Sequence, residues 1–218
     1  GPSGVGKSTV SRKVAAATDF AYLDTGAMYR AVGWYLDRHA VALDDNEAIA
    51  TAMKSFTMEL RPAANEMSDV GVIVNGEDVS RIIRTPEMAM LASRVSALPI
   101  IRDILSEIQK SYGTKGRIVA EGRDTGTVIF PDAGYKFFLD AKPEERARRR
   151  VAQLARNGVT ASLQEILALT RERDHNDRNR AVAPLKKADD ALLIDTTEIN
   201  LETVVLKILE EVARKRGQ

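Results

Sequence analysis

Gly1-Pro2-Ser3-Gly4-Val5-Gly6-Lys7-Ser8 opens the sequence and fits the pattern G-x-x-x-x-G-K-[ST] at every defined position. Glycines let the backbone curl so that successive N–H groups point at a phosphate, and the helix expected from Lys7 to Ala17 directs its positive end at the same anion. In such loops the lysine reaches the β- and γ-phosphate oxygens and the serine binds Mg²⁺. The motif therefore predicts binding of a nucleoside triphosphate and leaves the phosphoryl acceptor open.

A loop of this kind normally follows a buried strand of a parallel sheet. The sequence begins at Gly1 without one. We therefore expect the complete protein to carry an apolar strand of about five to seven residues immediately before Gly1, as the first core strand.

Strand and helix patterns alternate along most of the remaining chain. This alternation predicts an α/β fold of the P-loop NTPase type, with a mostly parallel sheet and helices on both faces. The expected strands are Phe20–Asp24, Arg117–Ala120, Lys136–Leu139 and Ala191–Ile194. The expected helices after the first are Gly26–His39, Asn46–Lys54, Pro143–Arg156, Ser162–Asn176 and Leu201–Lys215.

The segment 55–112 differs from this pattern and predicts a small insertion. The stretches 56–60 and 70–74 alternate or are β-branched, and Asn75-Gly76 is a strong tight-turn signal, so we expect a small antiparallel sheet. Two helices, Pro86–Ala97 and Ile100–Ser111, are expected to follow, separated by Pro99. The predicted domains are a kinase-type core (1–54 and 113–218, with a lid at about 150–163) and this insertion (55–112).

The overall composition excludes several classes of protein. The 218 residues carry 32 Lys and Arg against 31 Asp and Glu, a formal net charge of +1, which gives no sign of a nucleic-acid or membrane partner. No apolar run approaches the roughly 20 residues of a membrane span. The absence of cysteine excludes disulfides and thiolate metal sites, and agrees with a cytoplasmic location. We expect a cytoplasmic monomer that acts on small molecules.

Four further segments resemble the bacterial-type cytidylate kinases, a family of P-loop nucleoside monophosphate kinases. Thr25 stands where serine is common in that family, and both residues carry a hydroxyl group. The resemblance spans nearly the whole chain and implies an ATP- and Mg²⁺-dependent kinase that phosphorylates CMP and dCMP to CDP and dCDP. The segments are Leu23–Arg30, Asn75–Ser80 with Ile83–Thr85, Glu121–Ala133, and Arg173-Asp174 with Asp177–Pro184.

The resemblance also implies which residues form the site. Residues for ATP are Gly1, Pro2, Ser3, Gly4, Val5, Gly6, Lys7, Ser8, Thr9, Arg149 and Arg150. Residues for CMP are Thr25, Arg30, Ser93, Arg102, Arg123, Asp124, Arg173, Asp177 and Arg180, of which Arg30, Arg123 and Arg180 bind the acceptor phosphate. Lys7, Arg123 and Arg180 are the expected catalytic residues. From the loop motif Ser8 is an expected Mg²⁺ ligand, and Glu121, which ends a strand, is expected to hold the ion through water, with Asp24 as the alternative.

The residue chemistry supports several of these roles. Arg123 follows the expected strand from Ile118 to Ala120, and open α/β sheets bind ligands at the carboxyl ends of their strands. Guanidinium groups suit phosphate oxygens. Arg173, Asp177 and Arg180 are spaced i, i+4, i+7, which places them on one helical face. A solvated ladder of ion pairs is the alternative interpretation of that run.

Base recognition is expected to rest on Ser93, Arg102 and Asp124. Cytosine presents an amino donor at N4 and acceptors at N3 and O2, so a carboxylate can accept from N4 while Arg and Ser donate to the acceptors. Uracil reverses the pattern at two of these atoms. The alternatives are that Ser93 bonds within its own helix and that Arg102 is a surface charge.

An arginine run and the two histidines also bear on the expected site. The run Arg146–Arg150 is expected to lie where the lid over ATP begins. The alternative is that its individual members belong to an exposed basic helix face. Phosphoryl transfer to an already ionised phosphate requires charge stabilisation more than a general base, so neither His39 nor His175 is expected to be catalytic.

Two other functions remain open from the sequence. One is a P-loop kinase for another small acceptor, such as UMP, AMP or shikimate. The other is a non-enzymatic nucleotide-binding or RNA-binding regulator. The near-zero net charge and the five Phe and five Tyr, which form no interleaved aromatic platform, argue against an RNA-binding protein.

Overall fold

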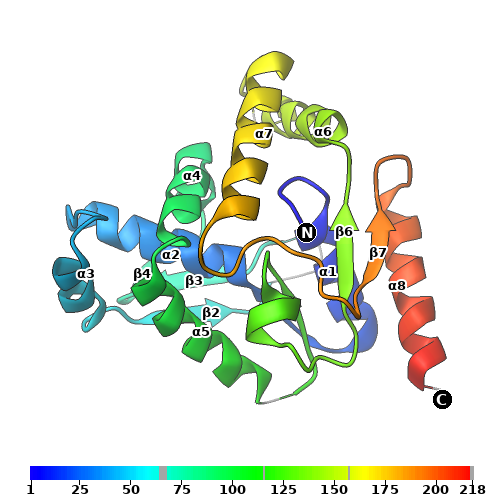
Figure 1. Cartoon of the computed structure of the whole chain (residues 1–218), viewed down its shortest axis with the longest axis horizontal. Coiled ribbons are helices and arrows are strands. Elements are labelled where there is room, and N and C mark those ends of the chain that lie inside the picture. Colours follow the sequence, from blue (N-terminus) through cyan, green and yellow to red (C-terminus); the bar gives the residue numbers. More distant parts are fainter. Residues whose placement is uncertain (64–67, 115, 157, 217–218) are drawn as a thin grey trace. The chain divides into compact units, whose positions relative to one another are not determined.

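The computed structural model describes residues 1–63, 68–114, 116–156 and 158–216. Residues 64–67 of the predicted insertion and residue 157 of the predicted lid lie outside the described residues. The chain divides into two compact units. Figure 1 labels their helices and strands. The first unit comprises Gly1–Ala17 and Arg123–Gln218, and the second comprises Thr18–Gly122.

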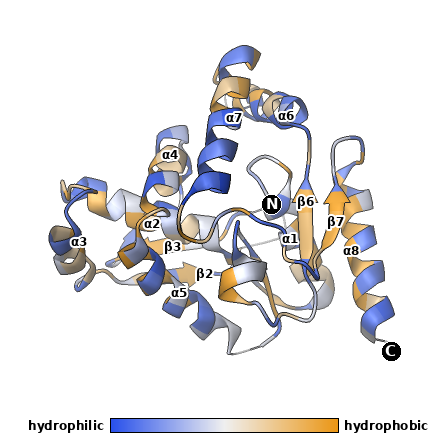
Figure 2. Ribbon diagram, in the orientation of Figure 1, coloured by the Kyte–Doolittle hydropathy of each residue, from blue (hydrophilic) through white to orange (hydrophobic). Residues whose placement is uncertain are grey.

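The first unit is built around two parallel strands, β6 (Phe137–Asp140) and β7 (Leu192–Asp195), which pair from Phe137 opposite Leu192 to Asp140 opposite Asp195. Both strands are strongly hydrophobic, whereas α7 is mostly hydrophilic (Figure 2). The helices of this unit are α1 (Lys7–Thr18), α6 (Pro143–Arg156), α7 (Leu163–Asn179) and α8 (Leu201–Arg216), and a short π-helical turn, η2, spans Thr125–Ile129.

Two parts of the first unit pack closely. The helices α6 and α7 lie against each other (Figure 1). The second closely packed part includes Val5 of the loop before α1 and Val10 of α1, which are almost fully buried. Ile194 of β7 and Val204 of α8 are also almost fully buried. Their burial anchors the loop before α1 in an apolar core.

The second unit contains a parallel pair and a separate antiparallel sheet. The strands β1 (Ala21–Asp24) and β5 (Ile118–Glu121) pair in parallel, so that Asp24 and Glu121 end their strands side by side. The antiparallel sheet has the order β2 (Met58–Arg61), β3 (Gly71–Val74), β4 (Glu77–Asp78). Asn75 and Gly76 both have positive φ, 47° and 84°, and close the turn between β3 and β4. The predicted hairpin signal at this position is therefore confirmed.

The helix α2 (Thr25–Arg38) organises the second unit. Its N-cap is Asp24, whose Oδ1 accepts from the amide of Ala27 at 2.8 Å. Met28 and Leu36 of α2 are fully buried. The other helices of this unit are α3 (Asn46–Met53), η1 (Ile82–Arg84), α4 (Pro86–Val95) and α5 (Pro99–Gly113), and α2 contacts η1, α4, α5, β3 and β5.

The predicted α/β class, with parallel strands and helices, is confirmed. The helices and strands predicted from Lys7 onward form, and most of their ends shift by one to three residues. The helix α7 ends at Asn179, so Arg180 leaves the helix as its C-cap with ψ of 142°. Within the described residues, no helix is both long and apolar enough to span a membrane.

Candidate active site

The loop before α1 adopts a backbone that two glycines make possible. Gly4 and Gly6 have φ of 80° and 92°, a region that side-chain-bearing residues rarely adopt. A Cβ on Gly4 would also lie 3.2 Å from the Cβ of Arg146. Lys7 folds back over this loop, because its Nζ donates to the carbonyl of Pro2 at 2.5 Å. The loop at the start of α1 thus holds a lysine ammonium against its own backbone, and helix N-termini with such a charge suit a phosphate group.

A buried threonine that the sequence analysis did not identify supports the loop from β7. Thr196 follows β7 and is 2% exposed. Its Oγ1 lies 3.2 Å from the carbonyl oxygen of Val5 and 3.1 Å from that of Asp140, and its single hydroxyl proton is shared between these two acceptors. A single threonine after a strand gives no sequence signal for such a role. Arg149 of α6 donates in turn to the Thr196 carbonyl at 2.5 Å and to Glu145 at 3.1 Å.

The predicted ATP residues on α6 are only partly exposed. Arg149, which contacts Thr196 and Glu145, is half-buried. Arg150 donates to the side chain of Gln153 at 2.8 Å. Burial lowers the pKa of Arg150, which still remains charged at neutral pH. Arg146, the first member of this basic run, is 2% exposed, so the alternative of an exposed basic face fails for this residue.

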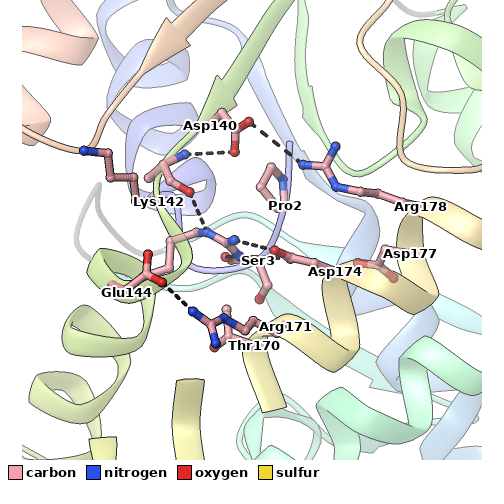
Figure 3. A network of polar contacts seen from close by, with 12 residues as sticks. Pro2, Ser3, Asp140, Lys142, Glu144, Thr170, Arg171, Asp174, Asp177 and Arg178 are labelled. Atoms are coloured by element: carbon pink, nitrogen blue, oxygen red, sulfur yellow. Dashed lines mark hydrogen bonds and ion pairs between the residues drawn. The ribbon is translucent and has the colours of Figure 1, made fainter. Parts of the chain in front are cut away.

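Arg146 joins three segments of the first unit, and two of its partners, Ser3 and Asp174, are labelled in Figure 3. Its guanidinium donates to the carbonyl of Ala141 at 2.9 Å, to the carbonyl of Ser3 at 3.1 Å, and to both carboxylate oxygens of Asp174. On the exposed side of the same two helices, Arg171 of α7 pairs with Glu144 of α6 at 2.7 Å. Nothing in the sequence distinguished Arg146 from its arginine neighbours.

Five of the predicted CMP residues gather around the C-terminal half of α7. Arg173 donates to the Oγ of Ser3 at 3.3 Å, and Arg123 donates to the Oδ2 of Asp177 at 2.8 Å. Asp124 lies 3.6 Å from Arg180, both with nearly buried side chains. These contacts exclude the alternative of a solvated ladder of ion pairs for Asp177, which is 3% exposed.

The charges of this cluster act on Asp177. Burial by itself raises the pKa of a carboxyl group. Here the charge of Arg123 and its hydrogen bond, with the charges of Arg173 and Arg180, outweigh burial and hold the pKa of Asp177 below its ordinary value. Asp177 is therefore a carboxylate at neutral pH and can accept hydrogen bonds.

The second unit places a carboxylate and two arginines at the end of β1. Asp24 accepts from Arg30 through Oδ2 at 3.2 Å and lies 3.7 Å from Arg84, whose Nε lies 3.2 Å from Asp69. Asp24 therefore caps α2 through one oxygen and holds Arg30 through the other. Within the described residues the Nε of Arg30 is buried without a hydrogen-bond partner.

The other predicted residues of the second unit are mostly buried. The Thr25 hydroxyl donates to the carbonyl of Glu121 at 2.6 Å, and the Glu121 carboxylate accepts from the Tyr22 hydroxyl at 2.6 Å. Arg102 is 3% exposed and donates to the carbonyl of Ser96 at 3.1 Å, so it is not a surface charge. Ser93 is half-buried on α4.

The predicted site residues therefore fall into one group in each unit. In the first unit the structure connects Arg173 to Ser3 of the loop, Arg123 to Asp177, and Asp124 to Arg180, and in the second it connects Thr25 to Glu121. Of the predicted Mg²⁺ pair, Ser8 belongs to the first unit and Glu121 to the second. In the part of the chain that the structure describes, no group of three or more His, Asp or Glu is arranged to hold a metal ion.

Comparison with known proteins identifies the family. The cytidylate kinase family model matches residues 1–214. A cytidylate kinase of Oleidesulfovibrio alaskensis is 47% identical over 214 residues, which cover 97% of this chain and 95% of that relative. One of Carboxydothermus hydrogenoformans is 43% identical over 99% of this chain and 96% of the relative.

A longer relative shows the same match within a larger protein. The bifunctional pantoate ligase/cytidylate kinase of Synechococcus elongatus is 42% identical over all of this chain, which covers 41% of that protein. The resemblance seen in the motifs is thus confirmed over nearly the full length, and the chain belongs to the cytidylate kinase family.

Proposed function

We propose that this protein transfers the γ-phosphoryl group of ATP to CMP and dCMP, forming CDP and dCDP. The observation that carries the proposal is the phosphate loop with Lys7 folded over it, in a chain of the cytidylate kinase family. The relatives' names state the same activity for those proteins. The chain is accordingly a phosphotransferase with ATP as its donor.

The first step is binding of the ATP phosphates. The backbone amides from Gly4 to Ser8 and the start of α1 receive the phosphate oxygens, and the Lys7 ammonium exchanges the Pro2 carbonyl for the β- and γ-oxygens. Arg149 and Arg150 add positive charge on α6. These groups stabilise the charge that spreads over the equatorial oxygens during transfer.

The proposed protein ligands of Mg²⁺ are the Ser8 hydroxyl of the first unit and the Glu121 carboxylate of the second, both of them oxygen donors. The Ser8 hydroxyl is half-buried in the first turn of α1, and the Glu121 carboxylate is oriented by the Tyr22 hydroxyl. Oxygen donors of this kind, one or two from protein with phosphates and water completing the set, are what Mg²⁺ requires. When bound, the ion neutralises charge on the β- and γ-phosphates.

Acceptor binding is proposed to use the guanidinium groups. Arg30, Arg123 and Arg180 hold the CMP phosphate, and the buried Nε of Arg30 is a donor suited to a phosphate oxygen. Arg173 donates to a ribose hydroxyl and the Asp177 carboxylate accepts from one. Because the acceptor phosphate is ionised at neutral pH, no general base has to remove a proton.

The base is proposed to be read by Ser93, Arg102 and Asp124, and Thr25 of α2 is proposed to belong to the same CMP site. Asp124 accepts from the cytosine N4 amino group, and Arg102 and Ser93 donate to N3 and O2. In this arrangement UMP presents a carbonyl oxygen to a carboxylate, which opposes binding.

The domain boundaries, the oligomeric state and the cellular location are also proposed. We propose a core at 1–54 and 113–218, an acceptor-binding insertion at 55–112 and a lid at about 150–163. We also propose that the protein works as a cytoplasmic monomer with no nucleic-acid or membrane partner. The net charge of +1 supports the absence of a polyanion partner.

A substrate panel tests the proposed function. ADP release is measured with ATP, Mg²⁺ and each of CMP, dCMP, UMP, AMP, GMP and shikimate. We expect rapid turnover with CMP and dCMP and at least tenfold lower kcat/KM with UMP. Equal turnover with UMP would reduce the assignment to a pyrimidine nucleotide kinase. ATP binding without turnover on any acceptor would favour the regulator instead.

A further inference from the structure

We propose that the buried Arg146–Asp174 ion pair is a positioning device that fixes α7 against the phosphate loop. The proposal rests on the proposed function, because α7 carries Arg173 and Asp177, which are proposed to bind the CMP ribose. Neither member of the pair contacts the substrate in this account. Both act through the segments that they hold.

The geometry of the pair is that of a rigid, two-pronged link. Nη1 and Nη2 of Arg146 donate to Oδ1 and Oδ2 of Asp174, while Nε donates to the carbonyl of Ala141 at 2.9 Å. The Arg146 and Asp174 side chains are 2% and 12% exposed. Paired N–H···O bonds between a guanidinium and a carboxylate fix their relative orientation as well as their distance.

The same guanidinium also reaches the phosphate loop. Its Nη1 donates to the carbonyl of Ser3 at 3.1 Å, and Arg173, next to Asp174 on α7, donates to the Oγ of the same serine at 3.3 Å. Two successive residues of α7 are thereby connected to Ser3, one directly and one through Arg146. The close approach of Gly4 to the Arg146 side chain adds a packing contact between the loop and α6.

A second ion pair on the same helices provides the contrast. Arg171 of α7 and Glu144 of α6 also pair, at 2.7 Å (Figure 3). Their side chains, however, are 62% and 45% exposed. Exposed pairs of this kind add little to stability or to orientation. The two pairs join the same two helices, and the buried pair reaches the phosphate loop as well.

Stability alone is a weak reason to bury such a pair. Burying two charges costs desolvation, and well-packed apolar residues of similar volume are often equally stable or more so. What apolar residues lack is the directed hydrogen bonding that sets where α7 lies relative to Ser3. Since misplacement by about 1 Å can cost about 10²-fold in rate, a fixed distance between loop and α7 has a direct kinetic consequence.

The test compares two double variants that carry the same kinds of substitution. Arg146→Met with Asp174→Leu removes the buried pair without leaving a lone charge. Arg171→Met with Glu144→Leu removes the exposed pair from the same helices. Thermal unfolding, the dissociation constant of a non-hydrolysable ATP analogue, and kcat and KM for CMP are measured for both and for the unchanged protein.

We expect the buried-pair variant to unfold at nearly the original temperature and to bind the ATP analogue within about threefold. Its kcat/KM for CMP should fall about 10- to 100-fold, while the exposed-pair variant stays within about twofold. The single variant Arg146→Lys keeps the charge but lacks the planar fork, so it should not restore the rate. If the buried-pair variant does not fold, Asp174→Asn replaces it, with an expected loss of at least about fivefold in kcat/KM, since one carboxylate acceptor is lost.

A second readout does not depend on CMP. In the unchanged protein, binding of the ATP analogue should slow amide hydrogen exchange in α7, and this protection should be lost in the buried-pair variant and kept in the exposed-pair variant. An unchanged protein that shows the protection but does not phosphorylate CMP would overturn the proposed function alone. Retention of both the rate and the protection by the folded buried-pair variant, or by Asp174→Asn in its place, would overturn the positioning role alone.

Discussion

The Nε of Arg123 donates to the Oδ2 of Asp177 at 2.8 Å, although the two residues come from distant parts of the first unit's sequence. Arg123 follows the β5 strand and Asp177 lies in the last turns of α7. Burial, which would raise the pKa of Asp177, is outweighed by Arg123 and by the charges of Arg173 and Arg180. The pair therefore connects Arg123, proposed to bind the acceptor phosphate, to Asp177, proposed to bind the ribose as an ionised carboxylate.

The first prediction concerns Asp177 and pH. Because its folded-state pKa lies below the ordinary value of 3.8, the unfolded chain takes up a proton at higher pH than the folded protein. The stabilisation is complete well above pH 3.8 and is lost as the pH falls through the folded-state pKa. Asp177→Asn should lower the free energy of unfolding by about 1–3 kcal/mol at pH 7, and the difference from the unchanged protein should shrink below pH 3.8. Urea titrations at pH 7 and pH 3 measure this, and a difference independent of pH would refute it.

The second prediction concerns Lys7. Lys7→Ala removes the charge beside the migrating phosphoryl group, so kcat should fall by at least about 10²- to 10³-fold while the protein stays folded. Lys13→Ala on the same helix is the control, because the Nζ of Lys13 lies 3.9 Å from the carboxylate of Glu202 on α8. Steady-state kinetics and circular dichroism give the two readouts. Near-normal turnover in Lys7→Ala would remove the basis for assigning the loop to ATP.

The third prediction concerns the base. Asp124→Asn keeps the shape of the side chain but adds an amide donor that can face the uracil O4. The variant should lower kcat/KM for CMP about 10- to 200-fold and so reduce the ratio of kcat/KM for CMP to kcat/KM for UMP. The affinity for ATP should stay nearly unchanged. Asp132→Asn, at an exposed position, is the control. Equal losses with CMP and UMP would mean that Asp124 does not read the base.

The fourth prediction concerns Asp24, which caps α2 and holds Arg30. Asp24→Ala should cost about 0.5–2 kcal/mol for the lost cap and should also raise KM for CMP, because Arg30 loses the carboxylate that orients it. Asp45→Ala is a matched control, since Asp45 caps α3 with a 2.9 Å bond to Ala48 and is exposed. Similar kcat/KM values for CMP in both variants would show that Asp24 acts only as a cap.

Local patterns in the sequence were enough to predict most of the fold. The β-branched stretch from 70 to 74 followed by Asn75-Gly76 specifies a hairpin through backbone preferences of a few adjacent residues, and the structure has that hairpin. The phosphate loop is equally local, since its glycines at positive φ and its lysine lie within eight residues.

Features that depend on distant partners were not predictable in this way. Arg146 has the same sequence surroundings as its exposed neighbour Arg148, and its burial follows from meeting Asp174 and Ser3, which are far away in the chain. Thr196 likewise gained its role from the carbonyl of Val5. The spacing of Arg180 suggested a helical position, but the helix ends one residue earlier and Arg180 turns back to donate to Ala183 at 2.7 Å.

The most direct test of the central claim follows the phosphoryl group itself. The protein is incubated with Mg²⁺, CMP and ATP labelled in its γ-phosphate, and the products are separated by chromatography. We predict that the label appears in the β-phosphate of CDP, in proportion to the ADP formed, and that Lys7→Ala slows this transfer by at least about 10²-fold. Label recovered as inorganic phosphate at the same rate with or without CMP would contradict this prediction.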